Sequence, residues 1–480
     1  MISACSVVNV RGHKPVVLFS VPHGAAAGNM IRTGVLQAVL DAEPSVEVVL
    51  MSPLSGDPAF VSEVEHPRVR VAPLPPHRPA GLEARLVALM QAGYLESGIT
   101  ESVRIRRAEA QAKGIIRWIG AKHRMARTFA PSLVNRATRY DLIDRLVSHP
   151  AAERTFDEVR PSLVVTSSPG LIFAEVPLLR TARRRGIRSM AIDPSWDNFT
   201  NKLMPARRVD RLVVWNTLMQ QQAVELHGYD SDDVRVAGVP QWDRYFQAGA
   251  TASREEFFRV IGADPARKLI TLTTTPQELY AHHDHVLRVM QRAMQDGRWP
   301  AAQVLVRLHP RDDLAQYAPF EGAAGIIIEK PFRPTVRAGD GLAVDVTAAS
   351  QQHLANTLRY SDVVVNVAST IAIEAAIFDA PVVNVAFDGE AKVEFAKSAR
   401  RYYRFTHYAN ITRHGAVKVA WTPEELIGHV AQYLADRSLD AAARRAVVAE
   451  QCPFTDGRSA ERVAQAVVDE LRLVRDGARP

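Results

Sequence analysis

Small hydroxyl residues follow one of two apolar runs in the stretch 361–389. The runs 362–366 and 381–387 are typical of buried strands, and Ser369 and Thr370 come just after the first run. A short helical segment then begins, so its first backbone N–H groups have no partner within the helix. Those N–H groups and the positive end of the helix dipole favour an anion. The stretch therefore predicts a phosphate site, with the alternative that both hydroxyls only cap the helix.

A histidine at the end of another apolar run could belong to the same site. His309, Pro310 and Arg311 come directly after the run 304–308, where a strand end would hold them at the mouth of a cleft. The imidazole can donate to a phosphate or a base, and the guanidinium adds positive charge. A loop histidine that caps local backbone is the alternative. Glu374, one turn into the helix, is expected to bind ribose hydroxyls, unless it is simply exposed.

Two loops in the first half carry groups that could activate or bind an acceptor hydroxyl. His23 follows the run 16–20, and an imidazole has a pKa near neutrality, as a general base requires. Asp197 is the second candidate base. Its neighbours Trp196, a flat surface for a sugar ring, and Asn198 are expected to bind the acceptor. A polar loop histidine and a buried tryptophan beside a capping aspartate are the alternatives, and the sequence leaves open which group is the base.

All of these residues follow short apolar runs that alternate with helical segments. About six such runs lie in the first half of the chain, and a second series begins at 269–274. This alternation indicates an α/β fold with parallel sheets, which bind ligands beyond the carboxyl ends of their strands. A chain of 480 residues is also too long for one ordinary core. We therefore expect two α/β domains with a ligand cleft between them.

The expected domain boundaries follow from these runs. We place the first domain at 1–250, with a basic helical insertion at about 82–148, and the second domain at 251–421. Residues 422–480 are expected to form helices that close the fold and pack back across the domain junction. Thr422 begins this part with the pattern Thr-Pro-Glu-Glu, which is typical of a helix start.

Composition narrows the classes of partner and compartment. The net charge of +7, from 59 basic and 52 acidic residues, favours anionic partners such as nucleotide phosphates. Cys5 and Cys452 are the only cysteines, so a disulfide framework is excluded and a reducing compartment is expected. No apolar run reaches the roughly 18 residues of a membrane span, and the first residues lack a secretory pattern. We expect a cytoplasmic protein, with peripheral contact at the inner face of the cytoplasmic membrane as an option.

The segment 104–127 is the most basic part of the expected insertion. Apolar residues lie among its charges, so a helix there could attract an anionic membrane surface weakly or grip an acidic acceptor. The alternative is a helix that packs its apolar face on the domain and leaves its charges solvated. Its basic residues are Arg104, Arg106, Arg107, Lys113, Arg117, Lys122, Arg124 and Arg127.

Two segments, RLHPRDD and SDVVVNVASTIAIEAAIFDAPVVNV, resemble the donor-binding half of two-domain GT-B glycosyltransferases. The similarity is greatest to the branch with bacterial sialyltransferases, capsule Kdo transferases and CDP-glycerol glycerophosphotransferases. It implies two Rossmann-like domains that face a central cleft, with the acceptor in the first and the donor in the second. It also implies that His309 and Pro310 contact the nucleotide, that Ser369 and Thr370 contact its phosphates, and that the loop of Thr274 and Thr275 borders them.

The function that this resemblance implies is transfer of a sugar or a glycosyl-phosphate-type group. The donor would be a CMP-, CDP- or UDP-linked sugar, and the acceptor a hydroxyl of a cell-surface glycan, lipid or polymer. GT-B enzymes generally need no bound metal, so we expect no metal and no cofactor. His282 and His285 could share a helix face, but no distant ligands complete a metal site. No nucleic-acid partner is expected.

The same helix start also resembles UDP-N-acetylglucosamine 2-epimerases. Ile371 and Glu374 match the epimerase run Ser-Gly-Gly-Ile-x-Glu-Glu, whereas Ser369 and Thr370 replace its glycines and Ile373 its first glutamate. The replacements favour a transferase over a non-hydrolysing epimerase. A non-catalytic nucleotide-sugar-binding protein is the third alternative.

Overall fold

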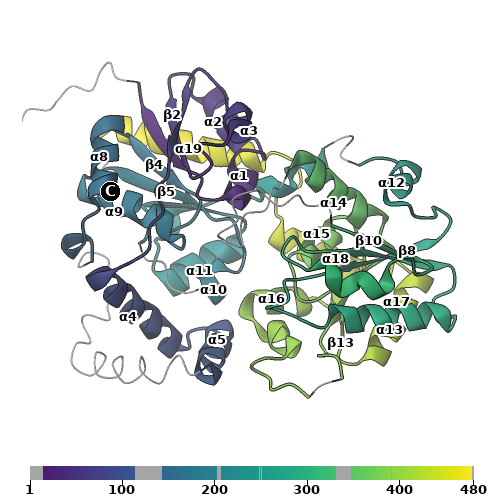
Figure 1. Ribbon diagram of the computed structural model, residues 1–480. Helices are drawn as coiled ribbons and strands as arrows, with labels where there is room; N and C mark the ends of the chain where they lie inside the picture. Colours follow the sequence, from purple (N-terminus) through teal and green to yellow (C-terminus); the bar gives the residue numbers. More distant parts are fainter. Residues whose placement is uncertain are drawn as a thin grey trace, which may run out of the picture.

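The computed structural model describes residues 14–113, 143–202, 207–247, 249, 251–330, 347–390 and 392–477. Within these residues the strands form two separate sheets, and Figure 1 shows them in two halves of the molecule that lie side by side. All strand pairs of both sheets are parallel. The expected α/β class is therefore confirmed.

The sheet of the first half has seven strands among the described residues, one more than the sequence indicated, in the order β3-β2-β1-β4-β5-β6-β7. These strands are β1 (Val16–Ser20), β2 (Glu47–Ser52), β3 (Val69–Pro73), β4 (Leu163–Thr166), β5 (Arg188–Ile192), β6 (Arg211–Val214) and β7 (Val234–Val236). Most of their apolar side chains are buried because helices cover both faces of the sheet, whereas those of the edge strand β3 are half-buried. The helices of this half are α1 (Gly24–Met30), α2 (Val35–Ala42), α3 (Pro58–Glu63), α4 (Gly81–Ser97), α5 (Glu101–Ala112), α8 (Pro150–Val159), α9 (Val176–Arg184), α10 (Asn198–Asn201) and α11 (Thr217–His227).

The sheet of the second half has six strands in the described ranges, in the order β10-β9-β8-β11-β12-β13. They are β8 (Lys268–Thr273), β9 (Ala302–Arg307), β10 (Ile326–Glu329), β11 (Val363–Asn366), β12 (Val382–Val385) and β13 (Val417–Ala420). Its helices are α12 (Arg254–Ile261), α13 (His283–Gln295), α14 (Ala348–Tyr360), α15 (Ile371–Ile377) and α16 (Thr406–Thr412). Because β8 lies between β9 and β11, the loops that follow these three strands meet at one edge of the sheet.

Three helices end the chain: α17 (Pro423–Ala435), α18 (Ala441–Gln451) and α19 (Ser459–Arg475). The expected helix start is confirmed, since the Thr422 side chain accepts the N–H of Glu425. The helix α18 packs against α15 of the second half, whereas α19 returns to the first half and packs on α2 and the sheet, as its position in Figure 1 shows. No helix among the described residues is long and apolar enough to cross a membrane.

Two short connections link the halves, and a carboxylate of the first connection forms hydrogen bonds with the helix start that follows the second. The first connection contains a 3₁₀ helix, η4 (Pro240–Phe246), and the second is the loop between α18 and α19. Asp243 of η4 accepts the N–H groups of Ser459 and Ala460, at 2.9 and 2.8 Å, and so caps the start of α19. The domain boundaries at 250 and 421 remain predictions.

Candidate active site

The loops after three strands of the first sheet surround a cavity of 550 Å³. We call it the first-sheet cavity. His23 follows β1, Ser167 and Ser168 follow β4, and Ser195 and Asn198 follow β5. The predicted residues His23 and Asn198 thus come together at the carboxyl end of the sheet, where parallel sheets bind ligands.

His23 caps the helix that follows it. Its Nδ1 accepts the N–H of Ala26 at 3.1 Å, and Ala26 belongs to the first turn of α1. A neutral imidazole carries one proton, so the acceptor role of Nδ1 places that proton on Nε2. The ring is therefore set to donate a hydrogen bond, which is not the arrangement that a general base needs.

Asp197 and Trp196 have structural partners in place of a substrate. Asp197 accepts hydrogen bonds from Ser195 and Asn201, at 2.5 and 3.2 Å, and lies 3.1 Å from the Lys202 ammonium. Burial acts to raise the pKa of Asp197, but Lys202, His407 and these hydrogen bonds together hold it well below its usual range. Such a carboxylate is a weak base, so the geometry disfavours the predicted role.

Trp196, which was predicted to bind a sugar ring, is also buried. It is 6% exposed, and its ring packs 4.9 Å from the His407 ring and 6.0 Å from the Tyr408 ring, both on α16 of the second half. The expectation that Trp196 offers its face to an acceptor is contradicted, because both domains bury it. A buried tryptophan was the alternative, but the sequence could not identify the residues that bury it, since they lie more than 200 residues away.

A different carboxylate, which the sequence analysis missed, ends strand β5. Asp193 is 1% exposed, and its Oδ1 accepts the N–H of Ser195 at 3.0 Å and the amide of Asn198 at 2.8 Å. Its Oδ2 has no hydrogen-bond partner among the described residues. Burial raises the pKa of Asp193 to about 7. Asn198 therefore lines the first-sheet cavity, but one of its amide hydrogens is bound to Asp193.

A second buried carboxylate, also missed, fixes the serine loop of the cavity. Glu175 lies in the 3₁₀ turn η2 (Phe173–Glu175) and accepts three hydrogen bonds. They come from the N–H and hydroxyl of Ser167, at 2.7 and 3.0 Å, and from the hydroxyl of Ser168 at 2.8 Å. The loop after β4 is therefore held in one conformation beside the cavity.

On the second sheet, the predicted loop residues do come together. The Thr274 hydroxyl after β8 accepts the N–H of His309 after β9 at 2.8 Å, and Thr275 donates its N–H to His283 at 2.9 Å. Burial, followed by the charge of Arg311, lowers the pKa of His309 to about 4. Its Nδ1 accepts the N–H of Arg311 at 3.1 Å. The imidazole is thus neutral near neutral pH, with Nε2–H available to donate.

The helix start after β11 differs from the expected anion site. The N–H of Ala368 donates to the Tyr403 hydroxyl at 3.4 Å, and the N–H of Ile371 donates to the Ser369 hydroxyl at 3.3 Å. The expectation of free N–H groups is therefore wrong at these two positions. Thr370 precedes α15 but makes no side-chain cap, and it follows β11, the strand beside that of Thr274.

Glu374 is neither exposed nor placed for a ribose. It is 9% exposed and accepts a hydrogen bond of 2.6 Å from the Tyr245 hydroxyl of η4. Burial raises the pKa of Glu374 to about 7. Glu374 therefore ties the helix after the hydroxyl turn to the connection between the halves, because Tyr245 belongs to that connection.

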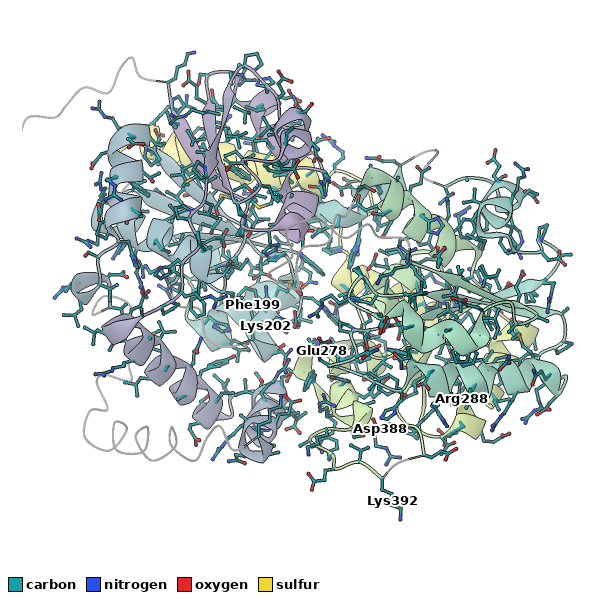
Figure 2. The ribbon with its side chains drawn as sticks, in the orientation of Figure 1. Phe199, Lys202, Glu278, Arg288, Asp388 and Lys392 are labelled. Carbon is teal, nitrogen blue, oxygen red and sulfur yellow. The ribbon has the colours of Figure 1, made fainter. Side chains whose placement is uncertain are left out.

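A cavity of 270 Å³ lies between α5 of the first half and the loops 277–282 and 388–401 of the second. Cations line it from both sides, among them Arg106, Lys113 and Arg401. Glu109 on α5 binds Arg401 at 2.7 Å across the border. Figure 2 shows Lys202 of the first half and Glu278 of the second near this border.

Part of the basic segment lies outside the described residues, namely 114–127. In the described part, each arginine of α5 has a carboxylate partner: Arg104 binds Glu101, Arg106 binds Glu109 and Arg107 binds Glu96, at 3.0 to 3.2 Å. The charges of α5 are therefore paired with carboxylates in the described part of the segment.

A histidine and carboxylate cluster elsewhere in the described residues is held by an arginine. His77, Glu83 and His149 have ligand atoms within 4.8 Å of one another. The buried Arg180 donates to Glu83, and its Nη1 lies 3.4 Å from the Nε2 of His149. A guanidinium already supplies the positive charge there, so the cluster favours a structural ion pair over a metal ion.

Comparison with solved structures identifies the class of fold. The chain resembles a putative UDP-N-acetylglucosamine 2-epimerase from Listeria monocytogenes, with 13% identity, 97% and 98% of the two chains covered, and a TM-score of 0.56. It also resembles S. aureus MnaA, solved with UDP, with 12% identity, 96% of this chain and 97% of that chain covered, and a TM-score of 0.54. A third similar structure is the wall teichoic acid polymerase TagF, with 10% identity, 96% and 89% of the two chains covered, and a TM-score of 0.50. With two parallel sheets and polar loops at their carboxyl ends, the protein has the GT-B fold.

The sequence model of CDP-glycerol:poly(glycerophosphate) glycerophosphotransferases matches residues 186–469. The chain belongs to this family and is a transferase that uses a nucleotide-activated donor. No curated protein matches it in sequence. The expected GT-B fold and transferase activity are thereby confirmed.

Proposed function

We propose that the protein transfers a glycerol phosphate or glycosyl group from a CDP- or CMP-linked donor to a hydroxyl of a cell-surface polymer, glycan or lipid. The observation that carries this proposal is the family match over residues 186–469, which spans the second sheet and strands β5, β6 and β7 of the first. The name of the family and the CDPG soak of TagF support a cytidine donor. UDP-linked donors form the alternative.

The donor would lie against the loops of the second sheet. The Nε2–H of His309 can donate to a phosphate oxygen or to the base. Thr370 follows β11, which β8 separates from the strand before His309, and its hydroxyl makes no cap bond to α15. Arg311, beside His309, adds a positive charge that favours the phosphates. Negative charge develops on the leaving phosphate in the transition state, and these donors would stabilise it there. We propose that no metal ion is required.

The acceptor would occupy the first-sheet cavity. His23 and Lys202 line this cavity, and the Lys202 ammonium suits an acceptor that carries hydroxyl or phosphate groups. The volume of 550 Å³ falls in the range of ligand sites in general, which runs from about 300 to 1,000 Å³. The end of a polyol phosphate chain meets these requirements.

A thermal-shift panel of CMP, CDP, UDP, GDP and ADP tests the donor site. A nucleotide at about a hundred times its Kd should add roughly 2.7 kcal/mol of stability. We expect His309→Ala to abolish most of the shift. His66→Ala is the matched control, because His66 makes the same 3.1 Å bond to the N–H two residues on, but in a loop before β3. A wild type that shifts with no nucleotide would contradict the proposal.

Incubation with a donor and with or without an acceptor then identifies the reaction. Transfer to a polyol phosphate acceptor, with release of the nucleotide, is the expected result. Epimer formation from a UDP-sugar alone would indicate the epimerase alternative. Nucleotide binding without turnover would indicate a non-catalytic binding protein.

We propose further that the protein works in the cytoplasm and touches the inner face of the membrane weakly. Leu82 and Leu89 are seven residues apart on one face of α4, and they are 50% and 36% exposed. We expect sedimentation with anionic vesicles at low salt, weaker with neutral vesicles, and lost in the double variant Leu82→Gln/Leu89→Gln. The absence of binding to anionic vesicles would refute the contact.

A further inference from the structure

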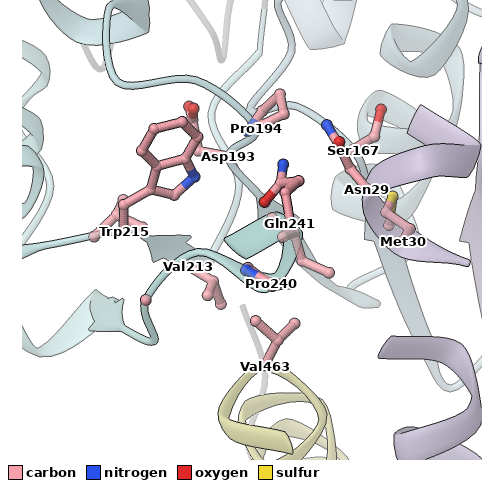
Figure 3. Close-up of a pocket in the computed structure, with 13 residues that line it drawn as sticks. Asn29, Met30, Ser167, Asp193, Pro194, Val213, Trp215, Pro240, Gln241 and Val463 are labelled. Carbon is pink, nitrogen blue, oxygen red and sulfur yellow. The ribbon is translucent and has the colours of Figure 1, made fainter. Parts of the chain in front are cut away.

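A small chamber adjoins the first-sheet cavity at the end of strand β5. Its volume is 10 Å³, roughly what one water-sized group requires. Asn29, Ser167 and Pro194 line both the chamber and the first-sheet cavity, so the two spaces are neighbours. Figure 3 shows Asp193 and Gln241 among the side chains around the chamber.

Two residues that line the chamber each have a buried side-chain oxygen that accepts no hydrogen bond from the described residues. These oxygens are Oδ2 of Asp193 and Oε1 of Gln241. A buried acceptor without a donor costs free energy, so the chamber suits a group that brings its own hydrogen. A hydroxyl group fits both this requirement and the volume.

We propose that the reacting hydroxyl of the acceptor enters this chamber and that Asp193 is the general base that takes its proton. The inference rests on the proposed transferase function. It assigns the role to a residue four positions before the aspartate that the sequence indicated. The other contacts of Asp193 support the role, because Ser195 and Asn198 both bind Oδ1 and leave Oδ2 without a donor among the described residues.

The side chains of the two other candidates for the general base already make other interactions. Asp197 has Ser195, Asn201 and Lys202 as partners. His23 uses Nδ1 to cap α1 and keeps its proton on Nε2. Asp193 alone among these three has a carboxylate oxygen for which the described residues supply no partner.

The charge state of Asp193 fits proton transfer near neutral pH. Burial raises its pKa to about 7, the N–H of Ser195 and the amide of Asn198 act against the rise, and the neighbouring charges are Asp197, which raises it, and Lys202, which lowers it. A base must be ionised to accept a proton. The rate should therefore increase with pH up to about 7 and stay level above it.

The step balances as a group transfer. The acceptor oxygen forms a bond to the phosphorus, or to the anomeric carbon, of the donor. The bond from that atom to the nucleotide oxygen breaks, and its electron pair leaves with the nucleotide. The hydroxyl proton moves to Oδ2 of Asp193, which later releases it to solvent.

The test compares Asp193→Asn with Asp197→Asn and Asp210→Asn. Asparagine keeps an oxygen for Ser195 and Asn198, so Asp193→Asn should fold and should still bind nucleotide in the thermal-shift assay. We expect its kcat to fall roughly 100- to 10,000-fold, as for loss of a general base, with the rise of rate toward pH 7 abolished. Asp210 is the matched control, because it accepts the N–H and hydroxyl of Ser189 at the opposite end of the strands.

Each outcome decides the assignment. Loss of rate in Asp193→Asn with nucleotide binding intact, and near-normal rate in Asp210→Asn, supports it. A normal rate in Asp193→Asn, or a larger loss in Asp197→Asn, overturns the assignment but leaves the transferase function standing. A wild type that binds nucleotide and transfers to no acceptor overturns both.

Discussion

Replacement of Arg180 by methionine should lower the free energy of unfolding of the first half by about 3–5 kcal/mol. Arg180 is fully buried on α9, donates to Glu83 and lies 3.6 Å from a carboxylate oxygen of Asp144. Loss of the guanidinium would leave two buried carboxylates with less positive charge around them. Removal of one partner from a buried ion pair is costly for this reason.

Urea unfolding followed by circular dichroism measures this effect. Arg183→Met on the same helix is the control, since Arg183 is exposed and should change stability by less than about 0.5 kcal/mol. The two halves can unfold in separate transitions. The comparison uses the transition that bound nucleotide does not shift, because the nucleotide is proposed to bind the second half and Arg180 lies in the first. Equal stability of Arg180→Met and wild type would show that the buried pair contributes little.

Replacement of Gly170 by alanine should reduce kcat/KM by about 100-fold, the size expected when a site is displaced by about 1 Å. Gly170 follows the serine loop with φ of +83°, and a Cβ there would lie 2.1 Å from the carbonyl oxygen of Arg207. That neighbour is backbone, so the loop has to move. Ser167 and Ser168 would move with it, out of the first-sheet cavity.

Gly186→Ala separates this displacement from ordinary strain. Gly186 also has a positive φ, +64°, but a Cβ there meets nothing within 4 Å. Both variants carry the cost of a left-handed alanine, about 1–2 kcal/mol, whereas only Gly170→Ala moves the loop. Similar kcat/KM values for the two variants would contradict the loop argument.

The strands and their loops could be predicted because parallel sheets leave a local signal. Runs such as 304–308 and 362–366 are continuous and apolar, and the polar residues after them mark strand ends. This signal placed Thr274 and His309 in adjacent loops, as the structure has them. The edge strand β13 gave little signal, because it has four residues and carries Lys418.

The roles of single polar residues depended on distant partners and could not be predicted. The hydroxyl of Tyr403, 35 residues away, takes the N–H that was expected to face a phosphate. The hydroxyl of Tyr245, 129 residues away, donates a hydrogen bond to the Glu374 carboxylate that was expected to bind ribose. Asp193 and Asp197 look alike in sequence, and only the tertiary packing distinguishes them. Asp193 has one carboxylate oxygen without a partner among the described residues, whereas both oxygens of Asp197 have partners.

The return of α19 to the first half has a consequence for synthesis of the chain. Val463, Val467 and Leu471 of this helix belong to the same buried cluster as Val17 and other residues of the first strands. A ribosome releases these residues only after the whole second half. The amino-terminal half therefore cannot complete its core during translation, although it emerges first, and must wait exposed while the other half folds. We expect chaperone binding to the nascent chain throughout that interval.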